Sequence, residues 1–137
     1  MWLAEALEAA VPQPNACSLA TADEQGRPSS RMLILKDIDA DGWHFATSRE
    51  SRKGKELTAN PHAALNFFWQ QQGRQVRVAG DVVELSAEAS AADWRARPGA
   101  DGGDNPHWQL YAIRPREIEF WQARHDRRHI RHRYAPR

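Results

Sequence analysis

The chain has 137 residues, a formal net charge of +1 and a single cysteine. This length favours one domain with a genuine core, and one cysteine excludes an internal disulfide framework. No apolar run approaches the ~20 residues that a membrane-spanning helix needs, which argues against an integral membrane protein.

The first half of the chain alternates short elements with turns. Apolar residues share one helical face over residues 2–10, so we expect a helix there. The same stretch carries no basic residue, which argues against a secretory signal and favours a cytoplasmic location. A meander of strands is predicted over residues 17–21, 31–36 and 43–47.

The second half begins with a helix that Ser51 can cap and that Asn60-Pro61 ends. Ser86 can cap a second helix, which runs to about Ala96 and leads into a loop rich in glycine and proline. Further strands are predicted over residues 62–69, 74–85, 108–113, 118–121 and 128–134. The expected fold is mainly β (α+β): a six- to seven-stranded antiparallel closed or split barrel with a few flanking helices, since closure removes exposed sheet edges.

Cations gather at two places before the C-terminal segment. Ser51, Arg52 and Lys53 open a helix, and a hydroxyl, two cations and free N–H groups at a helix N-terminus are typical of a phosphate site. Arg31 and Lys36 stand five apart, so on a regular strand they point to opposite faces. We expect them either to serve two different ligands or to mark the solvated ends of an apolar strand.

The C-terminal segment, residues 114–137, is strongly basic. It holds eight arginines and three histidines for a net charge of +5, whereas residues 1–113 carry −4. Such an asymmetry indicates an anionic partner at one site. Nucleic acid is one candidate, but the segment is short and alternates with acids, which favours a small phosphorylated ligand.

Other chemistries find little support. His125, His129 and His132 have helical spacing, yet no cysteine is nearby and several arginines would repel a zinc ion, so no metal is expected. Cys17 has no adjacent histidine and is interpreted as a buried apolar residue. No Ser-His-Asp arrangement, P-loop or dinucleotide fingerprint is visible.

Taken in order, several segments resemble the pyridoxamine 5′-phosphate oxidase family of FMN-binding split barrels. The resemblance begins at Pro14-Asn-Ala and extends over most of the chain. It then runs through residues 31–36, 45–47, 51–53, 60–61, 74–76 and 97–98, and ends in Ile118-Glu-Phe-Trp-Gln with Arg127, His129 and Arg131.

The resemblance implies a single FMN-binding split-barrel domain over residues 1–137 that forms a homodimer with FMN at the subunit interface. It matches the flavin phosphate and ribityl chain to Arg31, Thr47, Ser51, Arg52 and Lys53. Further flavin contacts match Gln75, Trp121 and Arg131. The substrate phosphate matches Lys36 and Arg97, and the catalytic pair over the substrate ring matches Arg127 and His129.

The implied reaction is oxidation of pyridoxamine or pyridoxine 5′-phosphate to the aldehyde, with oxygen as acceptor. Asp93 stands where the family places a phosphate-binding tyrosine, and Ala46 also replaces a tyrosine. The loop over 98–107 is shorter than the family's segment. These departures leave two alternatives open: a flavin enzyme for another ring compound of the phenazine-precursor type, or a flavin- or nucleic-acid-binding module without catalysis.

Overall fold

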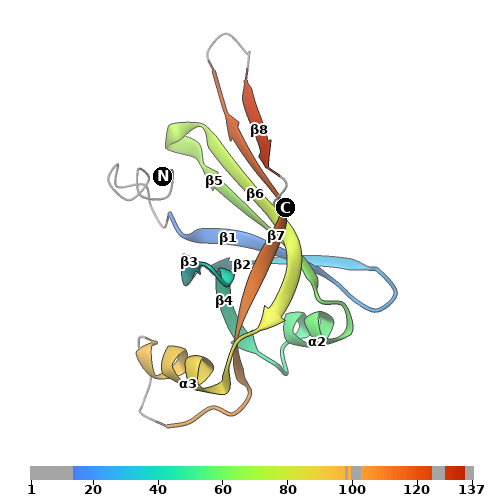
Figure 1. Cartoon of the computed structure of the whole chain (residues 1–137), viewed down its shortest axis with the longest axis vertical. Coiled ribbons are helices and arrows are strands. Elements are labelled where there is room, and N and C mark those ends of the chain that lie inside the picture. Colours follow the sequence, from blue (N-terminus) through green and yellow to red (C-terminus); the bar gives the residue numbers. More distant parts are fainter. Residues whose placement is uncertain (1–13, 98, 100–102, 125–128, 135–137) are drawn as a thin grey trace.

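The computed structural model describes residues 14–97, 99, 103–124 and 129–134. Its strands form one antiparallel sheet in the order β2-β1-β5-β6-β7-β4-β3, with β8 added on β7 (Figure 1). The strands are β1 (Ala16–Ala22), β2 (Pro28–Ile34), β3 (Asp37–Asp39), β4 (Gly42–Ser48), β5 (His62–Trp69), β6 (Arg74–Glu84), β7 (Trp108–Gln122) and β8 (Ile130–Tyr134). The helices are α2 (Arg52–Ala59), α3 (Ala87–Ala96) and the short 3-10 helix η1 (Gln70–Gln72).

The core lies on one face of the curled sheet. Buried and accessible residues alternate along β1 and β5, as the period of two in a strand requires. Phe45 and Tyr111, both almost fully buried, stack with their ring centroids 5.3 Å apart. The other large, fully buried side chains are Phe67, Leu19, Leu65, Ile113, Val76 and Val78. Burial of each such side chain contributes about 1.5–3 kcal/mol.

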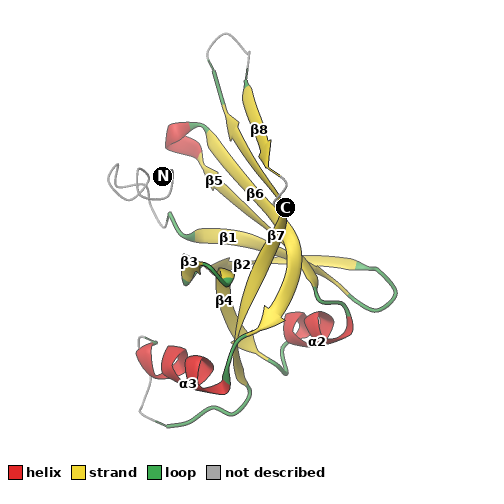
Figure 2. Cartoon of the chain, in the orientation of Figure 1, coloured by secondary structure: helices red, strands yellow, loops and turns green. Residues whose placement is uncertain are grey.

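The predicted fold class is confirmed, and the strand-rich architecture is plain in Figure 2. Both helices follow the serine that was expected to cap them: the Ser51 and Ser86 hydroxyls accept from the backbone N–H groups of Gly54 and Ala89. The strand predicted over 31–36 instead occupies Pro28–Ile34 and is followed by the unpredicted β3. The helix expected over 2–10 lies outside the described residues.

The predicted break between residues 113 and 118 is wrong, because β7 continues from Trp108 to Gln122. Opposite Pro115, β6 carries Gly80 next to a shift in register after Ala79. A Cβ on Gly80 would lie 2.0 Å from the carbonyl oxygen of Arg114, so only glycine allows the two strands to approach this closely. Ala79 pairs with Glu117 and Gly80 with Pro115, so Arg116 is the extra residue of a bulge in β7, and the proline is accommodated without ending that strand.

The β7–β8 hairpin and the two α-helices lie toward opposite ends of the molecule. In Figure 1 the hairpin of β7 and β8 projects at one end, and α2 and α3 lie toward the other. Among the described residues, no helix is long and apolar enough to cross a membrane.

Candidate functional site

The first turn of α2 is held firmly against the end of β4. Ser51 Oγ donates to the carbonyl oxygen of Ser48 at 2.7 Å and lies 3.1 Å from Thr47 Oγ1. A Cβ on Gly54 would lie 2.4 Å from the Ser48 carbonyl oxygen, so glycine is needed for this contact. The first N–H groups of a helix have no partner within it; here that of Gly54 donates to Ser51 Oγ, and Arg52 and Lys53 begin the helix next to this hydroxyl.

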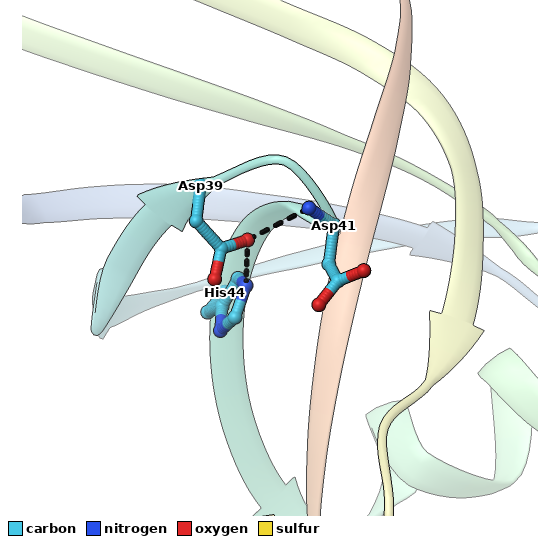
Figure 3. Close-up of side chains that lie close together, drawn as sticks. All are labelled: Asp39, Asp41 and His44. Atoms are coloured by element: carbon cyan, nitrogen blue, oxygen red, sulfur yellow. Dashed lines mark hydrogen bonds and ion pairs between the residues drawn. The ribbon is translucent and has the colours of Figure 1, made fainter.

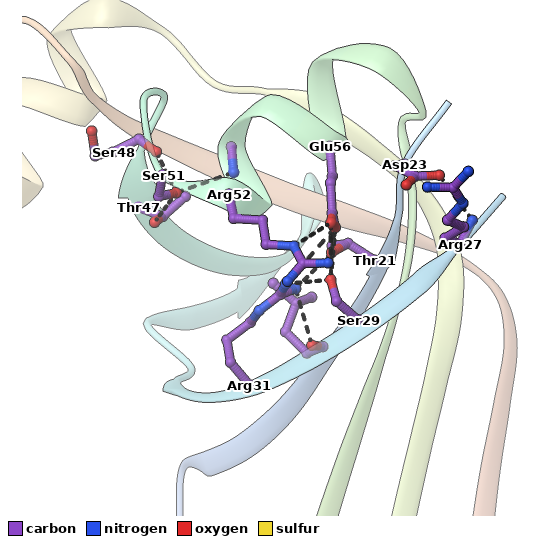
Figure 4. A network of polar contacts seen from close by, with 12 residues as sticks. Thr21, Asp23, Arg27, Ser29, Arg31, Thr47, Ser48, Ser51, Arg52 and Glu56 are labelled. Carbon is purple, nitrogen blue, oxygen red and sulfur yellow. Dashed lines mark hydrogen bonds and ion pairs between the residues drawn. The ribbon is translucent and has the colours of Figure 1, made fainter. Parts of the chain in front are cut away.

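Below this turn, a buried carboxylate organises two arginines (Figure 4). Glu56 is 6% exposed and accepts from the hydroxyls of Thr21 at 2.6 Å and Ser29 at 2.8 Å. Arg52 Nε donates to the same carboxylate at 3.1 Å. Arg31 donates to both hydroxyls at 2.6 Å, and its Nη2 lies 3.8 Å from Glu56 Oε2. Glu56 therefore fixes both guanidinium groups, one of them through a relay of hydroxyls.

These interactions keep Glu56 ionised. The hydrogen bond from Thr21 contributes most to lowering the pKa of its carboxyl, and Ser29, Arg52 and the positive charge of Arg31 act in the same direction. Burial opposes them but does not prevail.

Lys53 is the cation of this cluster without an acidic partner among the described residues. Its pKa is lowered, first by burial and then by the positive charge of Arg31. Arg31, Arg52, Lys53 and Glu56 together carry +2, which matches the charge of about −2 on a phosphate monoester. The fit between these residues and the phosphate group of FMN is therefore good in charge and in donor type. We call these four residues, with Thr47 and Ser51, the α2 cluster.

A second group of charges lies beside α3. Lys36 Nζ lies 3.7 Å from Asp93 Oδ1, and Asp93 Oδ2 accepts from the indole N–H of Trp108 at 2.9 Å. The guanidinium of Arg97 covers the Trp108 ring at 4.4 Å and the Trp94 ring at 5.0 Å. Asp93 and Trp108 thus link Lys36 to Arg97, and we call these residues the α3 cluster.

The remaining predicted flavin contacts form a row across the projecting strands. Gln75 on β6 pairs directly with Trp121 on β7, and Trp121 pairs with Arg131 on β8. Directly opposed residues in an antiparallel pair present their side chains on the same face. The row extends to Phe68 on β5, which is 60% exposed. We call this set the hairpin row.

His129 joins the hairpin row through its ring, which lies 4.8 Å from that of Trp121. Its Nδ1 accepts the backbone N–H of Arg124 at 3.1 Å. A neutral imidazole that accepts at Nδ1 carries its proton on Nε2. Arg127, the other half of the predicted catalytic pair, lies outside the described residues.

A second buried carboxylate, Glu119, lies next to the hairpin row and binds arginines of the neighbouring strands. It is 4% exposed and accepts from Arg133 Nε at 2.7 Å, with Arg77 and Arg131 at 3.6 and 3.7 Å. The hydrogen bond from Arg133 is the main reason that the pKa of Glu119 is lowered. Glu119 thereby anchors Arg131, the end of the row.

The predicted site residues therefore fall into three groups. Arg31 and Lys36 lie in separate clusters, but β2 ends at Ile34, so Lys36 is beyond the strand on which the five-residue spacing was argued. The hairpin row lies at the opposite end of the molecule from α3 (Figure 1).

The sequence prediction missed Glu56, Thr21 and Ser29. The i, i+4 spacing of Arg52 and Glu56 signals an ion pair on a helix, but nothing local signals that the carboxylate is buried.

Two other reactive groups have structural explanations. His44 Nε2 lies 2.7 Å from Asp39 Oδ1, which also accepts from the backbone N–H of Asp41 (Figure 3). The histidine bond contributes most to lowering the pKa of Asp39, and it ties β3 to β4. Cys17 is completely buried, and burial raises the pKa of its thiol to about 12. Its thiolate is therefore not accessible at neutral pH, as expected from the sequence.

Comparisons with known proteins identify the family. A family model described as Pyridoxamine 5′-phosphate oxidase matches residues 3–122. A second, described as Pyridoxine 5′-phosphate oxidase C-terminal dimerisation region, matches residues 108–137. A pyridoxine/pyridoxamine 5′-phosphate oxidase of Bordetella petrii is 41% identical, covering 98% of this chain and 80% of the relative. One from Paraburkholderia phymatum is 40% identical, covering 95% and 77%.

Solved structures show the same fold. PhzG from Burkholderia lata, in complex with tetrahydrophenazine-1-carboxylic acid, superposes with a TM-score of 0.94 at 32% identity, covering 99% of this chain and 83% of PhzG. An FMN-binding protein of Nostoc punctiforme related to pyridoxamine 5′-phosphate oxidase superposes with a TM-score of 0.74 at 18% identity, covering 98% and 95%. At that lower identity the likeness concerns the fold alone.

Proposed function

The chain belongs to the pyridoxamine 5′-phosphate oxidase family, and we propose that it is an FMN-dependent oxidase of a small ring substrate. The observation that carries the proposal is the α2 cluster, in which Glu56 and its hydroxyl partners fix Arg31 and Arg52 beside the Thr47–Ser51 turn. Lys53 adds a further cation, whose pKa is lowered first by burial and then by the positive charge of Arg31. Two cations that repel each other become favourable neighbours when a phosphate dianion binds between them. The cluster therefore suits the phosphate of FMN.

The site is completed in our proposal by a second copy of the chain. Trp121, His129 and Arg131 of the hairpin row lie in the segment that matches a dimerisation region, and the row lies far along the sheet from α3 (Figure 1). In a homodimer, the α2 cluster of one subunit would hold the flavin phosphate. The hairpin row of the other subunit would provide the aromatic and amide contacts for the ring.

FMN supplies the two-electron chemistry when it is bound. The chain's own groups bind and orient. The Trp121 ring would give a flat surface beside the flavin, and the hydrogen bond at Nδ1 would leave Nε2–H of His129 as the donor toward the substrate. In the overall reaction an amine or alcohol carbon is oxidised to an aldehyde, and oxygen is reduced to hydrogen peroxide. With an amine, water enters and ammonia leaves.

The test begins with colour. We expect the purified protein to be yellow and to bind FMN in a ratio of one per chain. If the substrate is the phosphorylated vitamer, pyridoxamine 5′-phosphate added without oxygen bleaches the flavin, and oxygen then restores the colour with formation of peroxide and aldehyde. A colourless protein that does not take up FMN would contradict the proposal at its first step.

A second candidate keeps the flavin and changes the substrate to a tricyclic ring of the phenazine type. The likeness to PhzG, together with Asp93 beside Lys36, favours it. It predicts that a reduced phenazine carboxylate bleaches the bound flavin faster than pyridoxamine 5′-phosphate does. If FMN binds and neither compound reacts, the chain is a flavin-binding protein without oxidase activity.

A further inference from the structure

The cations of the α3 cluster already have partners. Both oxygens of Asp93 are engaged, one by Lys36 at 3.7 Å and the other by the indole N–H of Trp108 at 2.9 Å. The side chains of Lys36 and Asp93 are 32% and 15% exposed, so water screens this pair only in part. The carboxylate is therefore held in place and is not free to swing away when a ligand arrives.

Arg97 is committed in a different way. Its guanidinium carbon lies 4.4 Å from the centroid of the Trp108 ring and 5.0 Å from that of Trp94, which positions it by cation–π contact on the same indole that holds Asp93. Lys36, Asp93 and Arg97 together carry +1. A phosphate dianion that approached Lys36 would also approach the carboxylate of Asp93, and the repulsion would offset much of the attraction of the cation.

We infer that Asp93 sets the substrate class of this enzyme: a ring compound that carries no phosphate where it meets Lys36 and Arg97. The inference rests on the proposed function, since it concerns the substrate of the same flavin site. A pair of opposite charges beside a flat indole suits an uncharged polar substituent, such as a hydroxyl or an amide, which can donate to Asp93 and accept from Lys36.

Two ring ligands that differ only in the phosphate provide the test: 4-deoxypyridoxine and its 5′-phosphate, neither of which has an amine or alcohol carbon at the reacting position. Each is titrated by calorimetry into the FMN-loaded protein and into an Asp93→Asn variant. Asparagine can still accept from Trp108, so the variant is expected to fold. Glu88→Gln, an exposed position on the same helix, is the matched control because it removes the same charge elsewhere.

We expect the unchanged protein to bind the two ligands with dissociation constants within about fivefold of each other. Asp93→Asn should tighten binding of the phosphorylated ligand at least ~10-fold and leave the other ligand unchanged, because a like charge no longer faces the phosphate. Glu88→Gln should leave both constants as they are.

Three results would overturn the inference. One is a preference of the unchanged protein for the phosphorylated ligand by more than about fiftyfold. Another is an Asp93→Asn variant with the same ratio of constants as the parent, and a third is no binding of the phosphorylated ligand to either protein. FMN uptake is read separately from the absorbance of the flavin, so a failure of the proposed function is recognised before any ligand is added.

Discussion

The α2 and α3 clusters contain the same kinds of charge, yet they differ in where the carboxylate lies. Glu56 is buried and binds Arg52 directly and Arg31 through the Thr21 and Ser29 hydroxyls, while Lys53 has no acidic partner among the described residues. Asp93 lies directly against Lys36. A buried carboxylate that positions cations prepares a site for an anion. A carboxylate that pairs with the cation itself takes the place that the anion would have. The comparison teaches that counting basic residues does not identify a phosphate site.

The largest effect is expected for Lys53→Met, which tests whether Lys53 is available to bind the FMN phosphate. We expect FMN to bind about 30- to 100-fold more weakly, since a charge-assisted contact of about 2–3 kcal/mol is lost. The apoprotein should unfold at the same temperature or a higher one, because Lys53 is partly desolvated and is repelled by Arg31. Fluorescence quenching of FMN and thermal unfolding measure the two effects. A parallel loss of stability would mean that Lys53 has a structural role.

Glu56→Gln tests the carboxylate behind the cations. An amide at this position brings an N–H₂ group toward donors, so we expect the free energy of unfolding to fall by about 2 kcal/mol. FMN binding should weaken as well, because Arg31 and Arg52 lose their fixed positions. Glu50→Gln is the control, since Glu50 is exposed and its pair with His107 should contribute less than about 1 kcal/mol. Equal losses in denaturant unfolding for both variants would contradict the role given to Glu56.

The same carboxylate predicts a pH dependence. The pKa values of Glu56 and Glu119 are lowered in the folded protein, so the unfolded chain takes up these protons more readily. The stability they contribute is complete above their unfolded pKa of about 4.3 and is lost as the pH falls through the folded values. Unfolding experiments between pH 6 and 3 should show this loss. The variant Glu56→Gln should lose less stability over this pH range than the parent, because one of the two carboxylates is removed, and a parallel curve for the variant would contradict the assignment.

The parts of the structure that local signals specify were predictable from the sequence. Ser51 and Ser86 cap their helices as expected, and strands β5 and β6 have nearly the predicted bounds. A cap depends on one side chain and the next three residues, so the sequence alone contains the information. The continuous β7 was missed because its continuity depends on Gly80, on a neighbouring strand.

The clusters show the same limit. The resemblance assigned Lys36 and Arg97 to one phosphate, and the structure links them through Asp93 and Trp108, but the pairing of Lys36 with Asp93 joins residues far apart in the chain. The sequence flagged Asp93 as unusual and gave no geometry for it. Glu56 was missed because its burial follows from the packing of α2 on β1, and no local pattern reports such packing.

The smallest expected effect concerns Arg97 and tests whether the α3 cluster binds phosphate. If Arg97 is stacked on Trp108 and is not part of a phosphate grip, Arg97→Ala should change the affinity for 4-deoxypyridoxine 5′-phosphate by less than about threefold. The loss of stability should be about 0.5–1 kcal/mol, the usual contribution of an exposed cation–π contact. Arg95→Ala, on the exposed last turn of α3, controls for a change of charge nearby. A tenfold or larger loss of the phosphorylated ligand alone would show that the guanidinium leaves the indole to bind phosphate. Asp93 would then not be sufficient to prevent phosphate from binding at the α3 cluster.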